Sequence, residues 1–185
     1  VLPVGVTGGS GLTALGTVAS GNLSNTAIVY PAGHIVQVAA QASGTEDTTI
    51  DGNNTLNDTV VVGSITPRYS NSRIMISAGF GASLSNTTGD GGYSALFKRS
   101  YTGHSSNPAN LSPWQQANHH ATFYRNPTGS VTFFHNYHFF TLIDTPGTTA
   151  SVTYTLQGAS YNAEACSMGG IMNSRWFVNL LEIKV

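Results

Sequence analysis

Apolar and polar residues alternate with a period of two along most of the chain after residue 34. The clearest alternation runs through residues 73–82, where Ile74 and Phe80 fall on the same face. This period is typical of a β-strand with one buried face, and no segment shows the i, i+3, i+4, i+7 spacing of an amphipathic helix. The pattern predicts strands at residues 34–39, 58–66, 73–82, 94–101, 119–125, 130–143, 150–161 and 174–185.

Turn sequences separate these segments at the spacing of a sandwich. Gly-Asp-Gly-Gly lies at residues 89–92, Asn-Pro-Thr-Gly at 126–129 and Asp-Thr-Pro-Gly at 144–147, and each combines residues that favour turns. We therefore predict an all-β fold for residues 34–185: a jelly-roll-like antiparallel β-sandwich of about eight strands. Residues 103–118 are expected to form a long loop.

Two of the predicted strands carry bulky apolar residues on both faces. In residues 131–143, Phe133 and Phe134 start two apolar series that point in opposite directions, and the C-terminal strand repeats this pattern. A sandwich strand normally has one polar face, so the second apolar face predicts a covering subunit and an obligate homo-oligomer. The expected interface residues are Phe133, Phe134, Tyr137, Phe139, Phe140, Trp176 and Phe177.

Residues 1–33 have a different character from the rest of the chain. They are rich in Gly, Thr, Ser and Asn, and their scattered aliphatic residues follow no helical period. A flexible linker would explain the composition, but it would not need so many aliphatic residues. We therefore predict an extended arm that contacts neighbouring chains or connects the domain to a shaft. The chain starts with Val rather than Met, which suggests one part of a longer polypeptide.

Composition narrows the class of protein. Only 8% of the residues are charged and the formal net charge is -1, while the mean hydropathy is -0.02. A polar but uncharged surface suits a β-rich protein in a durable assembly better than a cytosolic enzyme. The charge balance predicts no nucleic-acid partner, and no apolar run is long enough to predict membrane insertion. Cys166 is the only cysteine, so no intrachain disulfide is possible, and we expect it to be a small buried hydrophobe.

Several segments resemble the C-terminal domain of phage tail fibre and virion structural proteins, of the marine and cyanobacterial phage type. Their order along the chain is more specific than any one of them, and the N-terminal LPVGVTGGSGLTALG is also similar to a segment of phage fibres. The segments that carry the resemblance are GHIVQVAAQ, SITPRYSNSRIMISAGFG, SALFKRS, FFTLIDTPGTTASVTYTLQG and VNLLEIKV.

The resemblance implies a homotrimeric virion component at the distal part of a fibre. It implies localisation in the extracellular particle, contacts with other virion or tail proteins through the N-terminal arm, and attachment to host surface polysaccharide or another receptor. Residues 89–118 and 119–137 are more aromatic and richer in histidine than the family pattern. The resemblance therefore gives no information about ligand choice in these two segments.

Four histidines fall close to one another in the predicted strands. If residues 119–125 and 131–143 pair as a hairpin through the 126–129 turn, His119 or His120 would lie opposite His135 or close to it. A metal site with imidazole ligands would then be possible. Hydrogen-bonded interface histidines are the favoured interpretation, since no cysteine or carboxylate lies at a suitable spacing, and we expect no cofactor. The four residues are His119, His120, His135 and His138.

Aromatic and amide side chains gather in and around the predicted long loop. Sugar recognition combines an aromatic face with amide and guanidinium donors to hydroxyl groups. The competing interpretation is that Trp114 anchors the loop to the sandwich or to a neighbouring subunit, and it is favoured because tryptophan is usually largely buried. The candidate receptor-binding residues are Trp114, Gln115, Gln116, His104, Tyr101, Tyr124 and Arg125.

The sequence gives little support for an enzyme. No pair of its eight carboxylates stands out as an acid and base for glycoside hydrolysis, and no nucleophile elbow or phosphate-binding loop occurs. We expect a phage tail fibre domain that contributes to host recognition and attachment. The alternatives are a structural virion protein without receptor binding, such as a capsid decoration or collar component, and a secreted lectin.

Overall fold

The computed structural model describes residues 29–41, 44–51, 55–86, 91–106, 121–125, 132–161, 165–172 and 174–185. Within these ranges the chain is entirely β, with eleven strands and no helix. In the same part of the chain, no helix is long and apolar enough to cross a membrane. The predicted all-β class is confirmed.

The chain divides into two compact units, residues Val1–Tyr30 and Pro31–Val185, and all the strands belong to the second unit. The arm predicted over residues 1–33 has its first 28 residues outside the described ranges. In chain order the strands are β1 (Ile35–Gln41), β2 (Asp47–Ile50), β3 (Asn57–Ile65), β4 (Arg73–Asn86), β5 (Gly91–Tyr101), β6 (His104–Ser106), β7 (Ala121–Arg125), β8 (Thr132–Asp144), β9 (Val152–Tyr161), β10 (Cys166–Gly169) and β11 (Phe177–Ile183).

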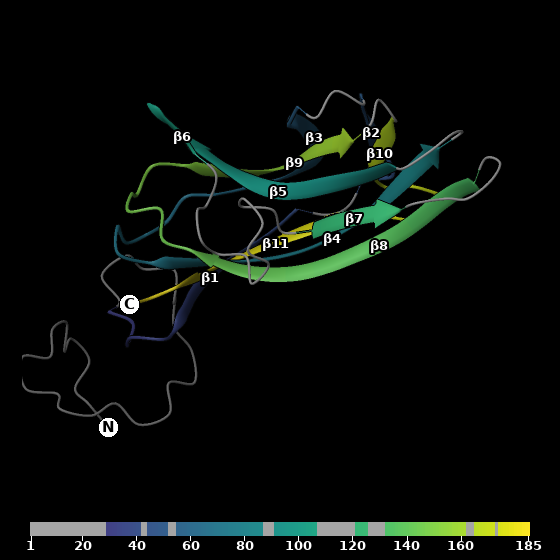
Figure 1. Ribbon diagram of the computed structural model, residues 1–185. Helices are drawn as coiled ribbons and strands as arrows, with labels where there is room; N and C mark the ends of the chain where they lie inside the picture. Colours follow the sequence, from purple (N-terminus) through teal and green to yellow (C-terminus); the bar gives the residue numbers. More distant parts are fainter. Residues whose placement is uncertain are drawn as a thin grey trace, which may run out of the picture. The chain divides into compact units, whose positions relative to one another are not determined.

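The strands form two antiparallel sheets, which Figure 1 shows as two layers. Sheet A has six strands and runs β1-β11-β4-β10-β2, with β8 also paired to β4. The long strand β4 makes this arrangement possible, because β11 and β10 pair with its successive halves and β8 pairs along its whole length. Sheet B has five strands and runs β3-β9-β5-β6, with β7 also paired to β5.

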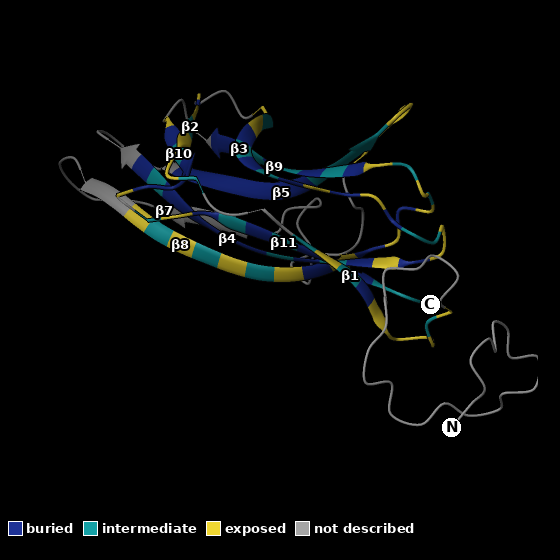
Figure 2. Cartoon of the chain, turned by 180° about the vertical axis from the view of Figure 1, so that it is seen from behind, coloured by how far each residue is buried: buried dark blue, intermediate teal, exposed yellow. Residues whose placement is uncertain are grey.

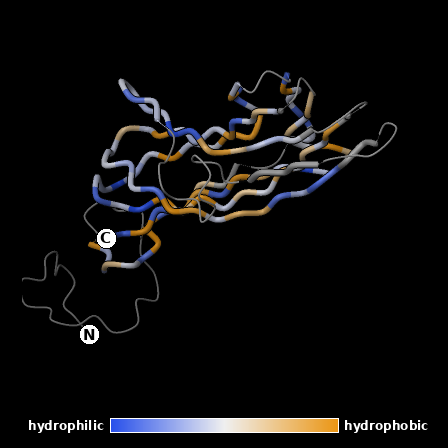
Figure 3. The backbone as a smooth tube through the Cα atoms, viewed as in Figure 1, coloured by the Kyte–Doolittle hydropathy of each residue, from blue (hydrophilic) through white to orange (hydrophobic). Residues whose placement is uncertain are grey.

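The hydrophobic core lies between the two sheets. Phe80 from sheet A and Tyr93, Phe97 and Tyr154 from sheet B are among its largest side chains, and all four are fully buried. Figure 2 shows β5 buried along most of its length, while exposed and half-buried positions alternate along β8. Figure 3 shows hydrophobic positions along strands of both layers, whereas β6 is hydrophilic. The alternation predicted from the sequence therefore corresponds to a real inner and outer face.

Each of the predicted strands corresponds to a strand of the structure, and three short strands were not predicted. These are β2, β6 and β10, of three or four residues each. The predicted hairpin of residues 119–125 and 131–143 is wrong. The strand β7 pairs with β5 in sheet B, whereas β8 pairs with β4 in sheet A. Consecutive strands can change sheet in a sandwich, so closeness in sequence did not mean pairing.

Candidate functional site

Two carboxylates lie on the inner face of sheet A, in one row that crosses four strands. Glu182 on β11 and Asp144 on β8 both pair with Ile74 of β4, and Gln37 of β1 pairs with Glu182. Glu182 is fully buried and Asp144 is 5% exposed. Two strand spacings separate the carboxylates, so their Cα atoms lie about 10 Å apart. We call these four residues the carboxylate row.

The Glu182 carboxylate is held by hydrogen bonds rather than by a cation. Among the described residues, neither ion pair involves Glu182. Hydrogen bonds to both oxygens stabilise the buried charge and fasten the connection between β3 and β4 onto β11. The donors are the backbone N–H of Arg68 (2.8 and 3.0 Å to the two oxygens), the backbone N–H of Tyr69 (3.1 Å), Ser72 Oγ (2.6 Å) and Gln37 Nε2 (2.7 Å).

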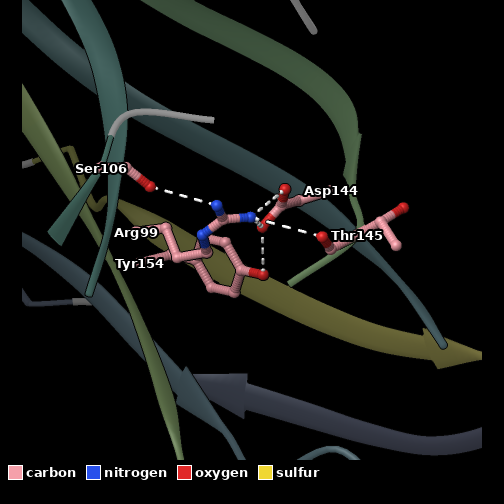
Figure 4. A network of polar contacts seen from close by, with 5 residues as sticks. All are labelled: Arg99, Ser106, Asp144, Thr145 and Tyr154. Atoms are coloured by element: carbon pink, nitrogen blue, oxygen red, sulfur yellow. Dashed lines mark hydrogen bonds and ion pairs between the residues drawn. The ribbon is translucent and has the colours of Figure 1, made fainter. Parts of the chain in front are cut away.

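The Asp144 carboxylate is held by a cation from the opposite sheet (Figure 4). Arg99 Nη1 of β5 donates to its two oxygens at 2.7 and 2.9 Å. Tyr154 Oη of β9 donates to it at 2.8 Å. Burial first, and then the Asp144 charge, raise the pKa of Tyr154, so the phenol stays a donor. This network joins β8 of sheet A to β5 and β9 of sheet B.

The geometry of the carboxylate row favours a structural role for both carboxylates over acid–base chemistry. Ile74 is fully buried and lies between the two acidic residues in the row, and donors already occupy both carboxylates. Glycoside hydrolysis needs two carboxylates that face a substrate. A signal for the buried role was present in the sequence, because Glu182 has the same parity along its strand as the apolar Val178 and Leu180.

The candidate histidines do not share one face of β8. His138 points inward, where its Nε2 lies 2.6 Å from Tyr93 Oη and its ring contacts the Phe80 ring. His135 lies on the outer face and is exposed. Burial lowers the pKa of His138 and raises the pKa of Tyr93 to about 12. His119 and His120 lie outside the described ranges, and the described residues contain no group of three or more metal-binding side chains.

The candidate receptor-binding residues fall at two ends of β5. Tyr101 and His104 pair across the β5–β6 turn, and their rings stack with centroids 4.7 Å apart. Tyr124 and Arg125 of β7 pair with the first two residues of β5. About nine residues of extended strand separate these pairs, a distance of roughly 30 Å. The four residues therefore do not form a single site, and Trp114, Gln115 and Gln116 lie outside the described ranges.

The outer face of sheet B carries a row of hydroxyl side chains. Ser64 Oγ and Thr153 Oγ1 are hydrogen-bonded at 2.9 Å, and the same row continues across Ser100 to Ser105. Next to it on this face, Lys98 Nζ bonds the Asp58 carboxylate at 2.6 Å. We call Ser64, Thr153, Ser100 and Ser105 the hydroxyl row. It offers closely spaced donors and acceptors. The stacked Tyr101 and His104 form the adjacent row, which lies on the other face of sheet B with Arg99, and Tyr101 packs against the core.

The outer face of sheet A carries many apolar side chains, although an uncharged polar row of Asn179, Ser77 and Thr141 crosses it. One row crosses four strands next to the carboxylate row, from Val38 through Leu181 and Met75 to Ile143. Val38 is 62% exposed and Ile143 is 40% exposed. We call these four residues the apolar row. The apolar face consists of the apolar row together with Ile35, Tyr137, Phe139, Phe177 and Ile183.

Two aromatic rings cover a glycine on the apolar face. Phe139 of β8 and Phe177 of β11 both pair with Gly79 of β4, and their centroids lie 6.1 Å apart. A Cβ atom on Gly79 would lie 2.5 Å from Phe177 Cε1, so only glycine allows both rings to lie over the strand. Phe139 remains 70% exposed. The nearby Tyr137 donates its hydroxyl to the Arg175 carbonyl.

The structure corrects two of the expected interface residues. Phe140 points inward, where its ring contacts those of Phe80 and Phe97. Trp176 is 7% exposed and belongs to the core. Phe140 faces the opposite sheet and Trp176 is buried in the core, so both side chains stabilise the fold. Tyr137, Phe139 and Phe177 lie on the outer face as expected, whereas the side chains of Phe133 and Phe134 lie outside the described part.

Cys166 has the role that the sequence predicted. The side chain is a buried free thiol in the core. Burial raises its pKa to about 12, so the reactive thiolate is not populated near neutral pH.

Comparisons with known proteins do not assign the chain to a family. A scan against protein-family models gives no match, and a search of curated proteins gives no significant match.

Proposed function

We propose that this chain is the distal domain of a phage tail fibre, which contributes to attachment of the virion to the host surface. The observation that carries the proposal is the position of the family-like segments in the fold. The segment ending in LLEIKV contributes Glu182, and the segment containing LIDTPG contributes Asp144. The segment containing ITPRYSNS supplies the three donors Arg68, Tyr69 and Ser72. The family-like segments thus contain the residues whose hydrogen bonds hold the two sheets and their connections together.

The proposed fold subtype is a jelly roll. Leaving aside the short strands β2, β6 and β10, the strand orders are β1-β11-β4-β8 in one sheet and β3-β9-β5-β7 in the other. An eight-stranded jelly roll consists of two Greek keys folded into two sheets, and these orders support it. The proposed assembly is a homotrimer in the virion, with the N-terminal arm in contact with other tail proteins.

The proposed recognition surface is the hydroxyl row on the outer face of sheet B. Ser64 and Ser105 are exposed, and hydroxyl groups can both donate and accept hydrogen bonds. A row of such groups suits a sugar, which carries many hydroxyls of its own. The proposed ligand is a host surface glycan, bound without chemical turnover.

Glycan binding tests this function. The full chain is passed over an array of bacterial surface polysaccharides, and binding is compared with that of Ser105→Ala and Thr153→Val. We expect both variants to bind at least about tenfold more weakly, since each loses a contact worth roughly 1.4 kcal/mol or more. Asp47→Asn on β2 is the control, because Asp47 is exposed but lies on sheet A. Equal binding by all four proteins would contradict the proposed surface.

Labelling of phage particles distinguishes attachment from a purely structural role. Gold-labelled antibodies against the chain should mark the ends of tail fibres in electron micrographs. Label over the capsid shell or collar would instead identify a structural virion protein. Absence of label on any particle, together with glycan binding by the isolated protein, would favour a secreted lectin.

A further inference from the structure

We propose that the apolar face of sheet A binds the apolar faces of neighbouring copies of this chain. In the trimer proposed above, three such faces surround a shared axis, but the inference itself does not depend on the virion assignment. It adds β1 and β4 to the interface expected from the sequence, through Val38 and Met75, and it removes the two inward-facing residues Phe140 and Trp176.

The exposed area of this face supports an interface between proteins. Five of its side chains are between 36% and 70% exposed. Together they present roughly 500 Å² of surface, near the upper limit for a monomer that has no partner. The half-buried Met75, Phe177, Leu181 and Ile183 extend this surface across β4 and β11. The total approaches the about 800 Å² per partner that a stable interface buries.

The charge distribution identifies another copy as the occupant. Between the row of Phe139 and the apolar row, no outward position on β4, β8 or β11 carries a charge. Residues near a symmetry axis meet their own equivalents, so any charge there would meet a like charge at a cost of several kcal/mol. Arg73 lies only at the end of β4, opposite Ile183. The side chains between the two rows, Ser77, Asn179 and Thr141, are polar but uncharged, so this face satisfies the condition without a second kind of protein.

The opposite face of the molecule does not meet these requirements. On sheet B, the outward positions carry the hydroxyl row and the Lys98–Asp58 ion pair. Burying these groups against another sheet would remove their water without supplying new partners. We therefore assign contacts with other copies to sheet A, and contact with solvent and ligand to the part of sheet B that carries the hydroxyl row and the Lys98–Asp58 ion pair.

The mass of the assembly at several concentrations tests the inference. The full-length protein is compared with Phe139→Glu, with Val38→Lys, and with the control Ser64→Glu, which places a charge at an exposed position of sheet B. We expect the unsubstituted protein and the control to form the same oligomer by light scattering and native mass spectrometry. In each sheet A variant, the concentration below which the oligomer dissociates should be at least about 100-fold higher than in the unsubstituted protein, since one desolvated charge costs several kcal/mol.

Two outcomes would overturn the inference. The first is a monomeric unsubstituted protein at 100-fold above the concentrations used for glycan binding, or its capture by neutral lipid vesicles in place of self-association. The second is an unchanged oligomer in Val38→Lys, which changes a side chain that is 62% exposed and so keeps the test valid if Phe139→Glu does not fold. Neither measurement uses a glycan or a host cell, so failure of the proposed function would leave this result intact.

Discussion

Two rows of residues cross sheet A side by side, one residue apart on each strand, and they reverse the usual distribution of polarity. The carboxylate row points inward and is almost completely buried, although it contains two acidic side chains. The apolar row points outward and is half-buried or exposed, although it contains no polar side chain. A buried polar group and an exposed apolar patch are the informative exceptions in a protein surface.

The two rows differ in whether their side chains already have partners within the chain. Each of the two carboxylates in the carboxylate row accepts hydrogen bonds from several donors within this chain. The outer row has no covering layer among the described residues. The inner row therefore explains how one domain holds its connections in place, and the outer row indicates what the domain still needs from outside. Substitutions in the two rows should accordingly change different properties.

The largest effect is expected for Glu182→Gln in the carboxylate row. The substituted amide would turn an NH₂ group towards donors such as the backbone N–H groups of Arg68 and Tyr69, leaving buried donors unpaired. We expect a loss of about 3 kcal/mol in the free energy of unfolding, measured by urea denaturation at one protein concentration. Glu46→Gln, at an exposed position, is the control and should change little. A loss below about 1 kcal/mol for Glu182→Gln would show that the buried charge is dispensable.

A somewhat smaller effect is expected for Asp144→Asn. The substitution leaves the guanidinium of Arg99 without its counter-charge in a mostly buried position. We expect a loss of about 2 kcal/mol. The double variant Arg99→Met, Asp144→Leu should recover part of this loss, because no unpaired charge remains. Urea unfolding of Arg99→Met, Asp144→Leu and their double variant gives the coupling energy, and additive losses would mean that the ion pair does not hold the sheets together.

The third prediction concerns pH and the inner face of β8. Burial lowers the pKa of His138 below its ordinary value of 6.5. Below pH 6.5 the unfolded chain binds a proton that the folded chain does not, so stability is full above that pH and falls on acidification. We expect the urea midpoint to decline between pH 7 and 5. His138→Phe should remove it, whereas His135→Gln on the exposed side should keep it. The same decline in His138→Phe would assign it to other groups.

The smallest change in folding is expected for Ile143→Thr in the apolar row. Ile143 is 40% exposed, so the substitution should cost under about 1 kcal/mol within one chain. Its main effect should be on association, which makes the melting temperature depend on protein concentration. We expect that dependence to become weaker in Ile143→Thr and to be unchanged in Ser64→Ala. Equal slopes in all three proteins would mean that the outer row does not contact other copies.

The sequence predicted the inner and outer faces better than it predicted which strands pair. Alternation alone places Phe139 opposite in direction to Phe140, and the structure agrees. Pairing between β7 and β5, or between β8 and β4, depends on long-range contacts that a period of two does not encode. The short strand β10 was missed because its four residues, Cys166–Gly169, are too few to display alternation.

The candidate sites were harder to predict for the same reason. Tyr101 and Arg125 belong to one candidate receptor-binding site predicted from the sequence, but the register of β5 puts them at the two ends of this strand. Asp144 looked like a turn residue, whereas its side chain enters the core to meet Arg99 of the other sheet. Only the packing of one sheet on the other brings these two residues together.

The pairing of β1 with β11 has a mechanical consequence. Gly33 N–H donates to the Lys184 carbonyl at 2.7 Å, Lys184 N–H donates to the His34 carbonyl at 2.9 Å, and the ladder continues along β1. Antiparallel hydrogen bonds lie perpendicular to their strands. Tension applied along β1 through residue 31 therefore shears the whole ladder at once instead of opening it bond by bond. This direction of pull is the one in which two paired strands resist extension most strongly.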